Sequence, residues 1–399
     1  MEFAKLADLR LAPEGLAKLS ERGHFQREDG VSVEYCLFRC PGASRHVALL
    51  TGWDESFLKY GEVLWELVEA GCNVYTMDWR SQGLSGRMVP DPQLTYVDEF
   101  DDYVHDLLHF LEEVVCKGCG VSPSDLSVLG HSMGGFISTL VAAQLPRRFS
   151  RLAVVAPMFR MRAGMPHWAA YRVGQMLCAM GIGRRYVPGQ HGIDPAAHIT
   201  SKLTTDVGRL SNWEGIRRAF PLVAMAGFSP RWVLEAVKAQ NWLRKPANAS
   251  KVSLPMLLLE SEDDVFVCPA AFREFARVEG VDCRRIVYRG TYHEILMEKD
   301  APRSHAMAAV IAFLVEDKRP GEAEVIFDAN ASESNGAEAC NKTGSRSPAG
   351  ARPSGAVAAG AFALGVACAL LARVLLSAEG DRGGGGGGGG ILFPVRWRA

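Results

Sequence analysis

The chain has 399 residues, 48% hydrophobic and 22% charged, so it is long enough for one large domain or two to three ordinary ones with a sizeable core. Lys plus Arg (44) nearly balances Asp plus Glu (45), for a net charge of −1, which argues against binding to nucleic acid through bulk basic charge. The composition also excludes collagen, a coiled coil and a polytopic membrane protein.

Apolar runs typical of strands alternate with helical periodicity along residues 1–316. The expected strands, in chain order, are 31–38, 46–50, 73–78, 126–129, 152–155, 255–259 and 285–288. The expected helices between them are 57–70, 96–115 and 136–144. Because strands separated by helices favour parallel pairing, the predicted fold class is α/β, with a mostly parallel central sheet and helices on both faces.

Residues 96–115 have the clearest helical pattern. Their apolar side chains follow three-and-four spacing, which predicts one buried face. The other face is acidic, and we interpret it as solvated. Its members are Glu99, Asp101, Asp102, Asp106 and Glu112.

Residues 157–254 interrupt the alternation. They contain helical patterns at 168–180 and 231–243 but no convincing strand, and they are far longer than a connection between a strand and a helix needs. We therefore expect a helical cap inserted between two parts of the sheet domain, 1–156 and 255–316.

The composition changes near residue 316, and we expect 317–399 to be a disordered, low-complexity tail. Residues 317–354 have too few large apolar side chains to offset the entropy of ordering them. Farther on, an uncharged apolar stretch makes 355–376 a candidate membrane anchor. Because Ala and Gly insert weakly into membranes, a tail that binds no membrane is the alternative.

The ten cysteines are scattered, and the first residues have neither the charged-then-apolar build nor the cleavage site of a signal peptide. We expect reduced thiols in a cytoplasmic protein, which would associate with membranes through the C-terminal segment if that segment inserts. Cys116 and Cys119 have the spacing of half a zinc site or of a redox pair, but the sequence has no second CxxC to complete a zinc site. Neither a metal nor another cofactor is expected.

A candidate nucleophile lies where an expected strand meets an expected helix. Residues 130–134 read Gly-His-Ser-Met-Gly, which fits GxSxG, and the pattern stands between the strand 126–129 and the helix 136–144. A tight turn there projects the Ser132 hydroxyl clear of the sheet. It also leaves the Met133 N–H at a helix N-terminus, where it can stabilise a developing negative charge.

A serine hydroxyl needs a base and an acid that orients the base. His293 follows the last expected strand, in a loop where ligand-facing residues of open α/β sheets belong. The acid is Asp264 or Asp263, which follow the strand 255–259. We favour Asp264 because it directly precedes an apolar run that would anchor the loop.

The second oxyanion donor is expected in the loop after the strand 46–50. Trp53 follows Gly52 there, so its backbone N–H is the candidate. The Trp53 side chain would either pack in the core or line an acyl site.

These residues resemble the α/β-hydrolase superfamily and, within it, the lysophospholipase and monoacylglycerol lipase group, over about residues 25–316. The run Gly-His-Ser-Met-Gly-Gly at 130–135 is similar to the nucleophile elbow of this group, and 78–86 is similar to its DxRGxGxSG loop, with Ser81 where glycine is usual. Residues 52–56, together with Lys59 and Tyr60, are similar to the lysophospholipase branch, as are residues 292–296 together with 298–300. Thr51 replaces the histidine that begins the oxyanion loop of monoacylglycerol lipases.

The resemblance implies a serine hydrolase that cleaves the acyl ester of a single-chain lipid through Ser132, Asp264 and His293 and an acyl-enzyme. The expected partner is a lipid ester, with a membrane surface compatible and nucleic acid excluded. The alternatives are a general carboxylesterase, a proline-type aminopeptidase of the same superfamily, and a ligand-binding homologue without turnover.

Overall fold

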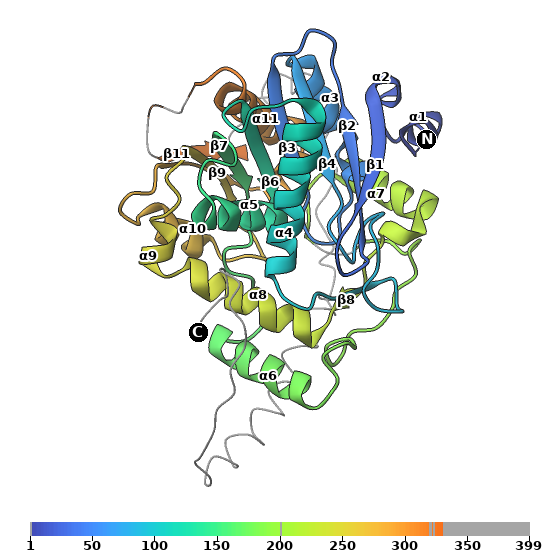
Figure 1. Cartoon of the computed structure of the whole chain (residues 1–399), viewed down its shortest axis with the longest axis vertical. Helices are drawn as coiled ribbons and strands as arrows, with labels where there is room; N and C mark the ends of the chain where they lie inside the picture. Colours follow the sequence, from blue (N-terminus) through green and yellow to red (C-terminus); the bar gives the residue numbers. More distant parts are fainter. Residues whose placement is uncertain (1, 200–201, 319–320, 322–323, 330–399) are drawn as a thin grey trace, which may run out of the picture.

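The computed structural model describes residues 2–199, 202–318, 321 and 324–329 (Figure 1). Within these residues one sheet has nine strands. Their order across the sheet is β1 (Ser20–Gln26), β2 (Ser32–Phe38), β4 (Cys72–Met77), β3 (Arg45–Leu50), β6 (Leu126–His131), β7 (Arg151–Val155), β9 (Met256–Ser261), β10 (Cys283–Arg289) and β11 (Glu324–Asp328).

Strand direction confirms the predicted fold class. β2 pairs antiparallel with β1 and β4, whereas every other neighbouring pair in this sheet is parallel. The strand β1, at the antiparallel edge, was not expected from the sequence. Its residues do not alternate between polar and apolar, and only Phe25 among them is buried, so the sequence shows no strand pattern there.

Helices cover both faces of the sheet, as predicted (Figure 1). One face packs against α4 (Asp101–His109), the π-helix η2 (Phe110–Gly118), α5 (Ser132–Gln144) and α10 (Pro269–Ala276). The other packs against α1 (Glu2–Asp8), α2 (Glu14–Leu19), the 3-10 helix η1 (Phe57–Tyr60), α3 (Gly61–Glu69), the 3-10 helix η4 (Ile295–Met297) and α11 (Asp300–Leu314).

Alternation along the central strands produces these two cores. In β3, Ala48 and Leu50 join the first core, whereas Val47 and Leu49 join the second. Since successive side chains of a strand point to opposite faces, a central strand covered on both sides must be apolar throughout. That requirement explains the short continuous apolar runs in the sequence.

Residues 157–254, here called the cap segment, contain α6 (His167–Ala179), α7 (Val207–Ala219), η3 (Pro221–Val223), α8 (Pro230–Leu243) and α9 (Pro246–Ala249). α6 and α8 pack on each other at one end of the molecule (Figure 1). A two-residue strand in this segment, β8 (Gly227–Phe228), pairs with β5 (Leu94–Thr95). The division of the chain into domains remains a prediction.

Two expectations from the sequence are wrong. The acidic face of the 96–115 helix is not fully solvated, because Asp106 is completely buried and accepts two hydrogen bonds from Arg80, at 2.6 and 2.7 Å. Disorder is also wrong for residues 324–328, which form β11 beside β10. The Phe327 ring lies 4.5 Å from that of His305 and 5.5 Å from that of Tyr288, so this short segment has apolar partners.

No helix in the described part of the chain is both long and apolar enough to cross a membrane. The candidate anchor, 355–376, lies outside the described residues.

Candidate active site

Ser132 lies at the sharp turn between β6 and α5. Its φ is +47°, a strained conformation for a residue with a side chain, and its backbone carbonyl accepts a hydrogen bond from Met158 N at 2.9 Å. The glycines beside it are required by close packing. A Cβ on Gly134 would lie 2.5 Å from the Thr51 carbonyl oxygen, and one on Gly130 would lie 2.7 Å from Gly135.

The structure brings together three of the side chains predicted from the sequence. His293 Nε2 lies 3.0 Å from Ser132 Oγ, and His293 Nδ1 lies 2.6 Å from Asp264 Oδ2. Because an ionised carboxylate only accepts hydrogen bonds, Nδ1 carries the proton and Nε2 is free to accept from the serine hydroxyl. Each residue follows the carboxyl end of a parallel strand, β6, β9 or β10, where such sites form.

Backbone donors hold the Asp264 carboxylate in place. Its Oδ1 accepts from Phe266 N at 2.8 Å and from Val267 N at 3.0 Å. Asp264 is buried, whereas its neighbour Asp263 is exposed, so the structure favours Asp264 as the partner of His293.

The His293 and Asp264 pair shifts both pKa values. Burial alone would raise the pKa of Asp264, but the charge and hydrogen bond of His293 outweigh it and lower that pKa. Burial alone would lower the pKa of His293, but Asp264, with smaller contributions from Glu294 and Glu55, raises it above its ordinary value. The pair therefore favours a charged carboxylate and a histidine of increased basicity.

The two backbone donors predicted from the sequence flank this serine. Met133 is the second residue of α5, where N–H groups have no acceptor within the helix. Trp53 lies in the loop after β3, next to Gly52, and a Cβ on Gly52 would lie 3.1 Å from Ser132 Cβ. The Trp53 indole donates to Thr95 Oγ1 at 2.7 Å and its rings lie 4.1 Å from the Phe228 ring of the cap segment.

A buried charge network joins the Trp53 loop to the His293 loop. Lys59 donates to Glu55 Oε1 at 2.8 Å and also to Glu294, the residue after His293. The other oxygen of Glu55 accepts from Gly52 N and from Tyr60 OH. Burial alone would raise the pKa of Glu55, but Lys59 and then His131 hold it well below its ordinary value.

His131 takes part in the same buried charge network, whereas His293 is the histidine whose ring lies within hydrogen-bond distance of Ser132. Its Nδ1 lies 3.1 Å from Glu55 Oε2, and its ring lies 4.9 Å from that of His293. The sequence pattern included Glu55, Lys59 and Glu294 in motifs of the resemblance but did not indicate that they contact one another. The one sequence feature that indicates an ion pair is the four-residue spacing of Glu55 and Lys59.

The loop after β4 is hydrogen-bonded to the end of the Trp53 loop. Asp78 is completely buried and accepts from Ser56 Oγ and Phe57 N, both at 2.8 Å, and from Leu84 N at 2.7 Å. Burial raises the pKa of Asp78 to about 6 despite these donors. Ser81, in the position where glycine is usual, has φ of +63°.

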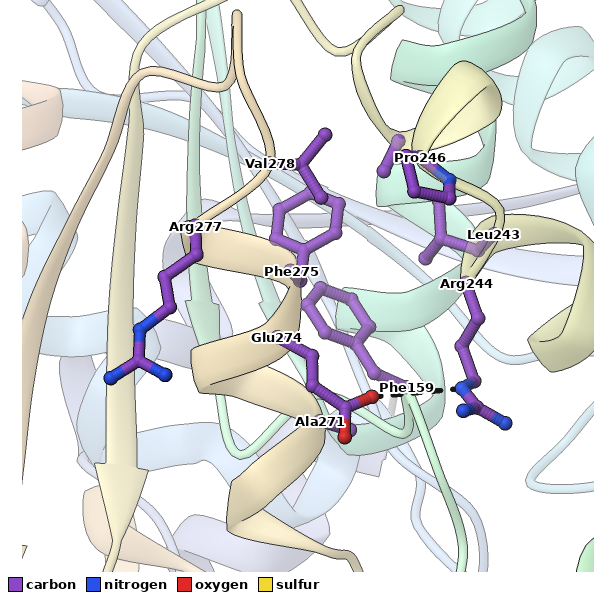
Figure 2. A pocket seen from close by; sticks show the side chains of 10 residues that line it. Phe159, Leu243, Arg244, Pro246, Ala271, Glu274, Phe275, Arg277 and Val278 are labelled. Atoms are coloured by element: carbon purple, nitrogen blue, oxygen red, sulfur yellow. Dashed lines mark ion pairs between the residues drawn. The ribbon is translucent and has the colours of Figure 1, made fainter.

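A separate cavity of about 360 Å³ lies between α8, α9 and α10 (Figure 2). Phe159, Leu243, Phe275 and Val278 give it a mainly apolar lining, and the ion pair of Arg244 and Glu274, at 3.7 Å, lies at its edge. Ser132, Asp264 and His293 do not line it, so this cavity is not the candidate active site.

The cysteines of the described residues are free thiols, Cys116 and Cys119 among them. Within the same residues no three His, Cys, Asp or Glu side chains gather in a way that could hold a metal ion.

The parallel sheet between two helical layers, with a serine at the turn from β6 to α5, defines the class: the fold is that of an α/β-hydrolase. The chain belongs to the family described as serine aminopeptidase, S33, which matches residues 42–300, and within it to the lysophospholipase and monoacylglycerol lipase group of ester hydrolases. The resemblance, the fold and the ester hydrolase activity predicted from the sequence are thereby confirmed.

Relatives of this group match the chain in sequence, and a solved structure matches its fold. The chain is 32% identical over 321 residues to lysophospholipase L2 of Escherichia coli (strain K12), covering 75% of this chain and 89% of the relative. It is 24% identical over 282 residues to monoglyceride lipase of Mus musculus, covering 69% and 84%. A soluble variant of monoglyceride lipase from Saccharomyces cerevisiae shares the fold, with a TM-score of 0.60 and 21% identity over 75% of this chain and 96% of that one.

Proposed function

We propose that this ester hydrolase cleaves the acyl ester of a single-chain lipid, a lysophospholipid or a monoacylglycerol, through Ser132, His293 and Asp264. The observation that carries the proposal is the continuous hydrogen-bonded series from Ser132 Oγ through the His293 ring to Asp264, at 3.0 and 2.6 Å. This arrangement supplies a nucleophile, a base and the group that orients the base.

The mechanism has two steps. In the first, His293 Nε2 takes the hydroxyl proton while Ser132 Oγ attacks the ester carbonyl, and the N–H groups of Met133 and Trp53 stabilise the oxyanion. His293 then returns the proton to the leaving alcohol, and the acyl group remains on Ser132. In the second, His293 deprotonates a water molecule that attacks the acyl-enzyme, and the fatty acid leaves as Ser132 regains its proton.

Apolar contacts across the Trp53 loop support a lipid substrate. The Trp53 rings lie 4.1 Å from Phe228, and the Phe228 ring stacks on Trp232 at 4.4 Å, so the cap segment places aromatic surface directly beside the proposed oxyanion donor. Two relatives carry the names lysophospholipase and monoglyceride lipase. We accordingly assign residues 157–254 the function of a cap over the acyl chain.

The outer surface of the cap segment suits a membrane surface, where such lipids reside. Trp168 and Met180 are 71% and 65% exposed, at the two ends of α6, and Arg172 on the same helix is also exposed. Exposed aromatic and basic side chains on one helix are typical of interfacial binding.

Release of fatty acid tests the proposal. Wild type and the Ser132→Ala variant would be compared on lysophosphatidylcholine and on monoacylglycerol, with circular dichroism as a check that both are folded. The proposal predicts release by the wild type and a loss of about 10⁴-fold or more in the variant. Equal release by both proteins, or none by a folded wild type, would contradict it.

A further inference from the structure

Arg217, on α7 of the cap segment, is a buried cation, and the buried carboxyl group of Asp54 lies within range of its charge without forming an ion pair with it. The residue is 3% exposed, and its Nε is buried without a hydrogen-bond partner. Among the described residues, no carboxylate forms an ion pair with it. Removing a charge from water is strongly unfavourable unless another charge or several hydrogen bonds compensate for it. The fold therefore holds a guanidinium that an anion would stabilise.

A second unsatisfied donor lies one turn earlier on the same helix. Trp213 is 2% exposed, and its indole Nε1 is buried without an acceptor. Residues four apart occupy the same face of a helix, so α7 presents an indole N–H and a guanidinium in one direction. Both are donors only, and neither can satisfy the other.

These two donors lie beside the loops that carry the proposed catalytic groups. The Trp213 ring lies 5.3 Å from Lys59 Nζ, and Lys59 in turn binds Glu294, the neighbour of His293. Arg217 acts electrostatically on Asp54, which directly follows the proposed oxyanion donor Trp53. The face of α7 that carries these two unpaired donors is therefore close to both the Trp53 loop and the His293 loop.

The carboxyl group of Asp54 does not prevent an anion from binding beside Arg217. Its Oδ1 accepts from Met225 N at 2.8 Å. Burial raises the pKa of Asp54 to about 7, although the charge of Arg217 acts in the opposite direction. In its protonated form this carboxyl group donates a hydrogen bond to an anionic oxygen instead of repelling it.

No other arginine in the described part of the cap segment is buried. Arg162, Arg172, Arg184 and Arg185 are exposed. Arg209 is paired with Glu62, Asp206 and Asp300. Burial together with an unpaired Nε distinguishes Arg217 from these arginines.

We propose that Arg217, assisted by Trp213, binds the phosphodiester of a lysophospholipid and is the specificity-determining residue that favours this substrate over a monoacylglycerol. The inference rests on the proposed hydrolysis of single-chain lipid esters at Ser132. A phosphodiester carries one negative charge over two oxygens, which suits the planar, two-pronged donor face of a guanidinium. A monoacylglycerol has no anion to place there.

The test compares kcat/KM for 1-acyl-lysophosphatidylcholine and for the monoacylglycerol with the same acyl chain. Arg217→Met is expected to lower the ratio of the two values by about 10- to 100-fold, the effect of losing a hydrogen bond to a charged group. Trp213→Phe, which removes only the indole N–H, is expected to lower it by about 3- to 10-fold. The matched control is Arg218→Met, because Arg218 is an exposed neighbour and should leave the ratio unchanged.

Inhibition gives an independent measurement. Glycerophosphocholine should compete with a neutral chromogenic ester in the wild type, and about 10-fold more weakly in Arg217→Met. An unchanged substrate ratio in Arg217→Met would overturn the inference, as would inorganic phosphate competing as well as the diester. If wild type hydrolysed neither lipid, the proposed function itself would fail, whereas an equal loss on both lipids would overturn only this assignment.

Discussion

Ser81 has a backbone conformation that a glycine would adopt with less strain. Its φ of +63° is in the left-handed region, and its hydroxyl is buried without a partner. The neighbouring Gly83 has φ of +56°, and a Cβ there would lie 2.2 Å from Asp78 Oδ2. The sequence motif showed that Ser81 was unusual, and the positive φ gives the physical reason why glycine is usual in that position.

Replacing Ser81 by glycine is expected to stabilise the protein by about 1 kcal/mol, since relief of backbone strain exceeds the added entropy of an unfolded glycine. Urea unfolding followed by circular dichroism measures the change. Gly83→Ala serves as the opposite control and should be strongly destabilising. A Ser81→Gly variant less stable than wild type would show that the turn is not strained.

The raised pKa of His293 predicts the acid limb of the pH profile. His293 accepts a proton from Ser132 only when it is neutral, and Asp264, Glu294 and Glu55 raise its pKa against the effect of burial. Asp264 keeps its charge throughout, because its own pKa is lowered. The kcat/KM for a neutral ester should therefore fall as the pH decreases through a midpoint above 6.5, the ordinary value for histidine. A midpoint at or below that value would be inconsistent with this account.

At the scale of elements, η1 and the loop before η4 are joined by Lys59. Its side chain is 3% exposed, and those of Glu55 and Glu294 are 2% and 5% exposed, so the three charges are almost wholly removed from water. Burial alone would lower the pKa of Lys59, but Glu294 and Glu55 raise it, which keeps the lysine charged.

Replacing Lys59 by methionine should lower the free energy of unfolding by about 3 to 5 kcal/mol, because two buried carboxylates lose their shared partner. Chemical denaturation measures this loss. Lys117→Met is the matched control, since Lys117 pairs with Glu113 at the surface of a helix and should change stability very little. Equal effects of the two substitutions would mean that the buried network is not stabilising.

The sequence predicted the central strands and the site residues near strand ends better than it predicted pairing between distant polar groups. Strand β6 and helix α5 follow from an apolar run and a glycine pattern that are local in the chain. By contrast, the burial of Asp106 depends on Arg80, 26 residues away in the chain. The unpaired Nε of Arg217 likewise depends on which groups pack around α7, and the sequence of α7 alone does not indicate them. The periodicity of apolar residues indicates which faces are buried. It does not indicate which charged side chains form ion pairs.

At the scale of the whole molecule, β11 extends the sheet beyond the boundary expected at residue 316. It pairs in parallel with β10, and Arg285 binds Glu324 at 2.7 Å. Both apolar residues that face the core, Val325 and Phe327, are partly buried against the helical layer that contains α11. The short alternation over 324–328 was too weak to separate from the surrounding polar sequence.

A chain that ends at residue 318 should therefore be less stable than one that ends at residue 329. Loss of β11 exposes part of Tyr288 and His305, and we expect a decrease of about 1 to 3 kcal/mol in the free energy of unfolding. Thermal unfolding of the two truncated proteins measures the difference. If both had the same stability, the pairing of β10 with β11 would contribute nothing to the fold.

The most direct test of the central claim is covalent labelling of the nucleophile. The protein would be treated with a fluorophosphonate, which reacts with activated serines, and then analysed by intact mass and peptide mapping. The account predicts one adduct, on Ser132, with ester hydrolysis lost in proportion to labelling and with no adduct on the folded His293→Ala variant. Inactivation with the adduct on another residue, or full activity after complete labelling of Ser132, would contradict the account.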